Sequence, residues 1–241
     1  MRTLVVGDIH SGLRALQQVL DKVQPRNDDV FVFLGDYVDG WSDAAETVEF
    51  LINFSEKYQC VFIRGNHDYL VHRYLKHNDQ NPMWLAHGGT ASKLSYDRLS
   101  EGAIKEHLHF YEGLTNYHID GKNRLYVHAG FTNVNGIQHE YFGNLVFWDR
   151  TLWELVCAMD TSVRPKDLNY PKRLTHYHEI YIGHTPVTRM GSDLPLQRAN
   201  VWNIDTGAAF KGSLTILDVD TKEFWQSESV YKLYPDEDGR N

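Results

Sequence analysis

The sequence has few cysteines, no long apolar run and no stretch dense in basic residues. Only Cys60 and Cys157 occur among its 241 residues, and they lie far apart along the chain. This spacing argues against a structural disulfide and favours reduced thiols in a reducing compartment. No apolar segment approaches the length of a membrane span, and the first expected strand begins at Thr3, leaving no room for a signal peptide. We therefore expect a cytoplasmic protein without a membrane partner.

Basic residues are outnumbered, with 24 Lys and Arg against 32 Asp and Glu and a formal net charge of −8. Since contacts to phosphates drive nucleic-acid binding, the lack of a basic stripe excludes nucleic acid as the main expected partner. A chain of this length with 42% hydrophobic residues suits one large α/β domain. We expect a single domain over residues 1–235 and a polar, solvated tail over residues 236–241.

The first third of the chain alternates strand and helix patterns. Apolar runs predict strands at 3–6, 30–34 and 60–63, and helical spacing of apolar residues predicts helices at 13–23, at 43–58 and from Tyr69 onward. This alternation predicts parallel strands joined by right-handed crossovers.

The middle and the last part of the chain follow different patterns. Residues 76–121 contain a turn at His87-Gly88-Gly89 and two helical segments, and we expect a helical cap or insertion over the site mouth. Short strand patterns return at 125–127, 180–182, 201–204 and 214–219, and we expect them to form a second, partly antiparallel sheet. The expected fold class is α/β with two sheets.

Polar side chains follow the expected strands at the point where each strand ends. Those that can bind metal are Asp8, His10, Asp36, Asn66, His128 and His184. Carboxylates at strand ends are costly to bury unless they hold cations or hydrogen-bond donors, and open α/β sheets place their ligand sites there. A set without thiolate suits manganese, iron, zinc or magnesium rather than a closed structural zinc site. Two ions bridged by one carboxylate and a water would use all six residues, and such sites promote phosphoryl displacement, so a phosphoester is the expected substrate.

Five ordered motifs carry a resemblance to a known family. They are Gly-Asp-Ile-His, Gly-Asp-Tyr-Val-Asp, Gly-Asn-His-Asp, His-Ala-Gly and Gly-His-Thr-Pro, spanning residues 7–186. In this order they resemble the calcineurin-like metallophosphoesterase superfamily. The chain is most similar to the phosphoprotein phosphatase branch, which includes bacterial Ser/Thr phosphatases and dinucleoside tetraphosphatases, because its last motif carries a single histidine. The resemblance implies a two-sheet β-sandwich flanked by helices, the αββα metallophosphoesterase fold, with a small helical insertion.

The resemblance also implies roles for individual residues. Asp8 and His10 would hold the first metal, Asp36 would bridge both metals, and Asn66, His128 and His184 would hold the second. His67 matches the histidine that protonates the leaving oxygen after attack by a metal-bridging hydroxide, and Asp39 matches the carboxylate that orients it. Manganese is the expected metal in vitro, with iron and zinc as alternatives.

Two arginines are candidates for the substrate phosphate, and one family arginine is missing. Arg64 and Arg150 could clamp the outer phosphate oxygens, although a core acid for Arg64, or Asp149 or Glu154 for Arg150, would be an ordinary structural partner. Gly40 stands where the eukaryotic-type phosphatases of this branch carry a phosphate-gripping arginine. Either one clamp is lost, or another arginine, such as Arg64, Arg150 or Arg189, compensates.

Other departures and candidates are smaller. Ser11 and Asp68 also depart from the usual motifs, and neither is expected to touch a ligand. A nucleobase could meet an aromatic rim built from Trp41, Trp84, Trp148 and Trp153, although such residues are more often core.

Three functions are compatible with these residues. The first is a protein phosphatase for phosphoserine, phosphothreonine or phosphotyrosine, which needs a shallow open groove. The second is a hydrolase of dinucleoside polyphosphates, which needs a deeper site with cationic and stacking residues from 76–121. The third is a non-catalytic scaffold, which is disfavoured because His67, Asp39 and all six ligands are present. The primary prediction is the Ser/Thr or dual-specificity phosphatase, acting on a phosphorylated protein or a small phosphoester, and the oligomeric state stays open.

Overall fold

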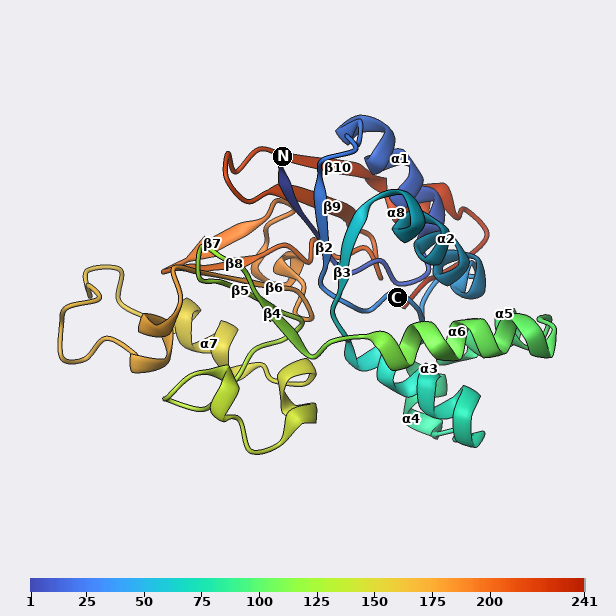
Figure 1. The fold of residues 1–241 in the computed structure, drawn as a ribbon, viewed down its shortest axis with the longest axis horizontal. Coiled ribbons are helices and arrows are strands. Elements are labelled where there is room, and N and C mark those ends of the chain that lie inside the picture. Colours follow the sequence, from blue (N-terminus) through green and yellow to red (C-terminus); the bar gives the residue numbers. More distant parts are fainter. Residues whose placement is uncertain (241) are drawn as a thin grey trace.

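Two mixed five-stranded sheets pack face to face with helices on their outer sides in a computed structural model that describes residues 1–240 (Figure 1). The first sheet has the strand order β10-β9-β1-β2-β3, and the second has the order β4-β5-β6-β8-β7. This architecture confirms the expected α/β sandwich flanked by helices.

The elements have the following bounds, with η1 a π-helical turn and the other η segments 3-10 helices. The first half contains β1 (Thr3–Val6), α1 (Leu13–Val23), β2 (Val30–Phe33), α2 (Ala44–Lys57), β3 (Gln59–Phe62), α3 (Asn66–His77), α4 (Pro82–Trp84), η1 (Leu85–Gly89), α5 (Thr90–Tyr96) and α6 (Glu101–Gly113). The second half contains β4 (Tyr117–Ile119), β5 (Arg124–Val127), η2 (Ile137–His139), η3 (Gly143–Phe147), α7 (Thr151–Ala158), η4 (Lys172–His176), β6 (Glu179–Ile182), η5 (Val187–Met190), β7 (Leu196–Arg198), β8 (Val201–Asn203), β9 (Ser213–Asp218), β10 (Phe224–Ser229) and α8 (Val230–Leu233).

The central strands of the first sheet are apolar on both faces because both faces are covered. β1, β2 and β3 pair in parallel, with α1 and α2 as the crossovers. Successive side chains on a strand point to opposite faces. Leu4 and Phe33 therefore join the helix-covered core, whereas Val5 and Val32 join the core between the two sheets. Continuous apolar runs of this kind are typical of parallel strands buried on both sides.

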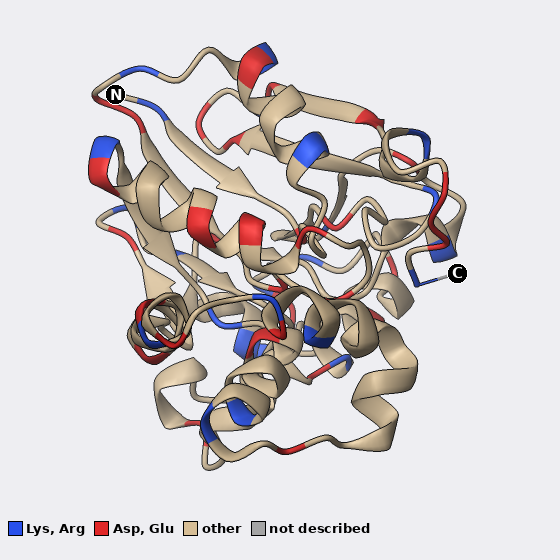
Figure 2. Ribbon diagram, turned by 90° about the vertical axis from the view of Figure 1, so that its right-hand side faces the viewer, with Lys and Arg blue, Asp and Glu red and all other residues tan. Residues whose placement is uncertain are grey.

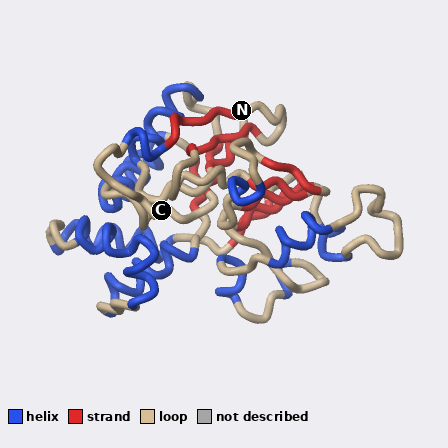
Figure 3. Tube along the Cα trace, turned by 180° about the vertical axis from the view of Figure 1, so that it is seen from behind, coloured by secondary structure: helices blue, strands red, loops and turns tan. Residues whose placement is uncertain are grey.

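The second sheet contributes aromatic side chains to the shared core. Tyr126 of β5 and Tyr181 of β6 stack with ring centroids 5.2 Å apart and lie in the same buried cluster as Val5 and Val32. β5, β6 and β8 are parallel to one another. Each sheet thus has three parallel strands. The loops that follow these strands meet in the middle of the molecule, where Figure 3 shows many loop segments between the helices and the strands.

The strand expected at 214–219 is real, but its assignment to the second sheet was wrong. β9 pairs antiparallel with β1 in the first sheet, with Val5 opposite Leu217. The hairpin of β9 and β10 covers the side of β1 that β2 leaves free, and a run of alternating side chains does not specify which sheet it joins. The strands β4, β7 and β10 were not expected, since the first two have three residues each and β10 is largely polar.

Helix α3 begins at Asn66, three residues earlier than expected. The Asp68 carboxylate accepts a hydrogen bond from the Gly65 N–H at 2.8 Å and so caps the helix from inside its first turn. The segment expected as a helical insertion contains α4, η1, α5 and α6, but β4 follows within it and belongs to the second sheet.

The segment expected as a solvated polar tail is solvated only in part. Gly239 and Arg240 are half-buried, and the Arg240 N–H donates to the Ala209 carbonyl at 2.9 Å. Asn241 lies outside the described residues.

Acidic and basic positions are interspersed along the outer helices and loops in Figure 2, as expected of solvated faces. None of the helices within residues 1–240 combines the length and apolarity needed to cross a bilayer.

Candidate metal and phosphate site

The predicted ligands lie in the loops that follow β1, β2, β5 and β6 and at the start of α3, which follows β3. Several of these loops hold non-glycine residues in the left-handed region, including Asp36 at φ 52°, Asp39 at φ 68° and His184 at φ 66°. Such conformations are costly and persist where the surroundings enforce them, which is common at functional sites.

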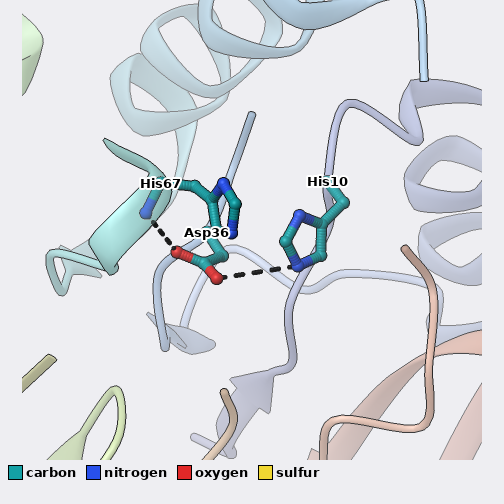
Figure 4. Close-up of side chains that lie close together, drawn as sticks. All are labelled: His10, Asp36 and His67. Carbon is teal, nitrogen blue, oxygen red and sulfur yellow. Dashed lines mark hydrogen bonds and ion pairs between the residues drawn. The ribbon is translucent and has the colours of Figure 1, made fainter. Parts of the chain in front are cut away.

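Asp36 lies at the centre of the site. Its Oδ1 accepts a hydrogen bond from the His67 backbone N–H at 2.9 Å, and its Oδ2 lies 3.6 Å from His10 Nε2 (Figure 4). The same Oδ2 lies 3.3 Å from His128 Nε2. Burial by itself would raise the pKa of Asp36, but the attraction of the neighbouring His128 and His67 rings holds that pKa well below its ordinary value.

Two groups of potential metal ligands share this carboxylate. One contains His10, Asp36 and His67, and the other contains Asp36, His128 and His184, with the ligand atoms of each group within 4.8 Å of one another. Asp8 Oδ2 lies 3.9 Å from His10 Nε2, so Asp8 borders the first group. Within residues 1–240, Asp8 Oδ1 and His184 Nε2 are buried without a hydrogen-bond partner. Buried acceptors without partners, around a shared carboxylate, fit a pair of metal ions.

Backbone carbonyls orient two of the imidazoles. His10 Nδ1 lies 2.9 Å from the Asp39 carbonyl and His128 Nδ1 lies 2.9 Å from the Leu34 carbonyl. A ring that donates from Nδ1 to a carbonyl presents Nε2 as the metal-binding atom. Burial lowers the pKa of His10 and of His184 well below the ordinary value, so both rings are neutral, as ligands must be.

The amide of Asn66 joins the second group. Its Oδ1 lies 3.2 Å from His128 Nε2 and 2.9 Å from His184 Nδ1. Without metal, burial would lower the pKa of His128, but the Asp36 carboxylate raises it to about 10. The structure therefore brings all six predicted ligands together.

Asp205 was not predicted for the site, although its place after the strand pattern at 201–204 was a usable signal. It is 3% exposed and lines the same cavity as Asp36. Burial raises the pKa of Asp205 to about 6, and burial together with the charge of Asp205 raises the pKa of Asp8 well above its ordinary value. Three buried carboxylates this close repel one another, which is a further reason for cations at the site.

His67 and Asp39 form a buried pair beside the ligands. His67 Nδ1 lies 2.7 Å from Asp39 Oδ2, and the same oxygen accepts a hydrogen bond from Trp84 Nε1 at 2.7 Å. This geometry leaves His67 Nε2 free to face the cavity, which His67 lines. The pair is thus arranged as a proton donor and its orienting carboxylate.

Asp68 was expected to touch no ligand, but it holds the backbone of one. Its carboxylate accepts from the Asp36 N–H at 2.8 Å and from the Tyr37 N–H at 2.9 Å. These bonds fix the loop that follows β2 and therefore the position of the shared carboxylate.

A cavity of about 530 Å³ opens onto these residues. The helical segment 81–87 contributes Met83, Trp84 and His87 to its wall, and Trp148 and Phe210 add aromatic surface from other loops. Of the four tryptophans considered for an aromatic rim, Trp41 and Trp153 are core and Trp84 is 2% exposed, whereas Trp148 is 44% exposed.

The two predicted phosphate-binding arginines lie in different surroundings. Arg150 lines the cavity and forms no ion pair with any of the described residues, so neither Asp149 nor Glu154 holds it. Arg64 is absent from the cavity wall, and its guanidinium donates to the carbonyls of Tyr111 and Leu114 at 3.0 and 3.2 Å. The geometry thus gives Arg64 a structural partner. Arg189 and Arg240 line the cavity beside Arg150.

A sequence profile of the calcineurin-like phosphoesterase family matches residues 1–205. Among curated relatives, the bis(5'-nucleosyl)-tetraphosphatase PrpE (asymmetrical) of Geobacillus thermodenitrificans (strain NG80-2) is 27% identical, and the match covers 88% of each chain. The protein of the same name from Bacillus anthracis (strain CDC 684 / NRRL 3495) is 28% identical over 90% of each chain.

Solved structures share the fold at lower sequence identity. A putative diadenosine tetraphosphatase has a TM-score of 0.62 at 16% identity, covering 93% of this chain and 92% of that one. A cold-active protein tyrosine phosphatase has a TM-score of 0.58 at 15% identity, covering 90% and 73%. At these identities the likeness extends to the fold alone.

Proposed function

The chain belongs to the calcineurin-like phosphoesterase family and is a phosphoester hydrolase, and from this premise we propose that it cleaves dinucleoside polyphosphates. This proposal departs from our primary prediction, a protein phosphatase, and adopts the second function considered from the sequence, a hydrolase of dinucleoside polyphosphates. The observation that carries it is the volume and lining of the cavity beside Asp36.

Residues 81–87 wall the cavity, whereas the exposed indole and the arginines that the alternative expected from 76–121 come from other segments. A volume of about 530 Å³ falls within the range of small-molecule sites, roughly 300–1,000 Å³. Trp148 and Met83 are 44% and 65% exposed and line this cavity, so both present apolar surface to a ligand. An exposed indole in a ligand cavity suits stacking on a nucleobase. A phosphorylated side chain on a folded protein would need a shallower groove.

Three arginines line the same cavity, namely Arg150, Arg189 and Arg240. A polyphosphate chain carries several negative charges, and one guanidinium group can donate two parallel hydrogen bonds to two phosphate oxygens. The names of the curated relatives, bis(5'-nucleosyl)-tetraphosphatases, support the same substrate class.

The metal ligands in this proposal are those implied by the resemblance. Asp8 and His10 would hold one ion, Asn66, His128 and His184 the other, and Asp36 both. The ions would supply Lewis-acid charge at the phosphate and a water of lowered pKa. We expect manganese to support activity in vitro, and the free thiols Cys60 and Cys157 agree with a cytoplasmic location.

The protein's own side chains would bind the chain of phosphates and deliver a proton. Water adds to one phosphorus, the bond to the bridging oxygen breaks, and the proton on His67 Nε2 passes to the leaving phosphate. Asp39 keeps the ring oriented through Nδ1 and stabilises its protonated form. Arg150 would bind outer oxygens of the attacked phosphate, whereas Arg64 lacks the position for this role.

Competition in one tube tests the proposal. The manganese-reconstituted protein is mixed with diadenosine tetraphosphate and a phosphoserine peptide at equal concentration and followed by phosphorus NMR. We expect the dinucleotide to disappear first, and the products, ATP with AMP or two molecules of ADP, identify the cleaved bond. Faster loss of the peptide would favour the protein phosphatase, and no loss of either would revive the scaffold hypothesis.

The matched control is Asp36→Asn, which removes the shared charge while preserving side-chain size. It should abolish turnover of both substrates. Residual hydrolysis in this variant would indicate a contaminating phosphatase.

A further inference from the structure

Arg240 reaches the cavity from a segment that is bound to the loop following β2. Tyr234 donates a hydrogen bond to Asp43 Oδ2 at 2.6 Å, and Glu237 accepts from the Ser42 N–H at 2.9 Å. We call residues 234–240 the closing strap. Figure 1 shows this red segment ending at the C mark in the middle of the molecule. The strap therefore lies over the loop that carries Asp36 and Asp39.

Glycines leave room for the strap and for the stem of Arg240. A Cβ at Gly40 would lie 3.5 Å from Arg240 Cγ, and a Cβ at Gly88 would lie 3.1 Å from the same atom. Gly239 has φ +61°, and a Cβ there would lie 2.7 Å from the Trp41 ring. The Arg240 stem thus occupies the space above Gly40, where a longer side chain would otherwise project.

Among the described residues, the guanidinium of Arg240 has no acceptor that would explain its position. Its Nε is buried without a hydrogen-bond partner, and Arg240 forms no ion pair within residues 1–240. The guanidinium lies over the Phe210 ring, with Cζ 5.5 Å from the ring centroid. A guanidinium carries five donors, and leaving a buried charged donor unpaired is costly. By comparison, Arg64, which has a structural role, donates to the Tyr111 carbonyl.

The surroundings of Arg240 indicate the missing acceptor. Arg240 lines the cavity with Asp36, His10 and His67. A Cβ at Gly40 would lie 3.5 Å from Arg240 Cγ and equally far from His10 Cβ, so the arginine stem lies beside the loop that carries His10. An anion bound at those ligands would bring its oxygens to the arginine.

We propose that Arg240 binds the outer oxygens of the substrate's reacting phosphate and takes the role that position 40 leaves empty. The inference rests on the proposed function, because it requires a phosphate at the metal site. The proposal assigns phosphate binding to a residue about 200 positions after Gly40, the position where the related phosphatases carry their phosphate-binding arginine.

Three variants test this assignment: Arg240→Gln, Arg240→Lys, and the control Arg98→Gln, an exposed arginine outside the cavity. Inorganic phosphate, as competitive inhibitor of p-nitrophenyl phosphate hydrolysis, is the probe. Since a charge-assisted hydrogen bond is involved, the inhibition constant of Arg240→Gln should rise about 10- to 100-fold. Lysine should restore part of this loss because it keeps the charge but not the fork, and Arg98→Gln should match the wild type.

Metal content and thermal midpoint are measured on every variant. An inhibition constant of Arg240→Gln within twofold of the wild type would overturn the proposal. So would a defect accompanied by metal loss and not relieved by lysine, because Arg240 would then be structural.

The probes also separate this inference from the proposed function. Diadenosine tetraphosphate is assayed in parallel with p-nitrophenyl phosphate. If the wild type does not hydrolyse the dinucleotide but the inhibition constant of inorganic phosphate is raised in Arg240→Gln, the proposed substrate is wrong and the role of Arg240 stands.

Discussion

Replacing His67 by asparagine should slow hydrolysis in proportion to the leaving group's need for a proton. The His67 ring is held by the 2.7 Å contact of Nδ1 with Asp39 and has Nε2 free toward the cavity. Its backbone N–H, which donates to Asp36, is retained in asparagine. The substitution therefore removes the proton donor and leaves the shared carboxylate in place.

The size of the effect follows from the chemistry of each leaving group. General acid catalysis contributes about 10²- to 10⁴-fold, or about 3–5 kcal/mol of barrier. A phosphoserine peptide, whose leaving alkoxide is strongly basic, should show the full loss in kcat. p-Nitrophenyl phosphate, whose leaving group departs without a proton, should lose less than about tenfold. Diadenosine tetraphosphate, with a phosphate as leaving group, should fall between them.

The assay is steady-state kinetics on the three substrates, with metal content measured on the same preparations. His109→Asn, an exposed histidine on α6 outside the cavity, is the matched control and should change nothing. Equal slowing of all three substrates would refute the acid role. Loss of metal from His67→Asn would instead make His67 a ligand, since it belongs to one of the two groups of potential ligands.

Three further predictions concern other parts of the chain. Gly183→Ala adds a methyl that overlaps Asp8 Oδ1, so metal affinity measured by titration should fall about 10- to 100-fold, whereas Gly121→Ala, with no atom near its added methyl, should bind metal normally. Burial raises the pKa of the Cys60 thiol to about 12, so only about one molecule in ten thousand carries the thiolate at pH 8. Alkylation of Cys60, followed by mass spectrometry, should therefore be slow until the protein is unfolded, and rapid labelling of the folded protein would contradict this. Trp41→Ala removes a fully buried ring whose Nε1 donates to a carbonyl at 2.8 Å, and urea denaturation should show a free energy of unfolding lower by about 3–5 kcal/mol. A loss below about 1 kcal/mol would mean that the surrounding core closes the cavity left by the ring.

The local signals in the sequence were sufficient for much of the fold. Continuous apolar runs and helical patterns identified β1 and α1 at their observed bounds, and β2, α2 and β3 to within a residue at each end. They failed where the outcome depended on partners. The strand at 214–219 was recognised, but its pairing with β1 was not, because alternation along one strand carries no information about the strand beside it.

The sequence by itself was enough to predict the ligand set proposed here, because each of these residues lies within a few residues of a strand end, and parallel strands bring their carboxyl ends to one edge. Only the tertiary structure decided which other residues face the proposed metal site. Asp205 reaches the site from β8, Arg240 reaches it from the closing strap, and Arg64 is turned away onto two backbone carbonyls. The physical reason is that a ligand carried on a strand end is placed by local hydrogen bonds, whereas a long arginine side chain takes whichever acceptor the packing of distant segments brings within reach.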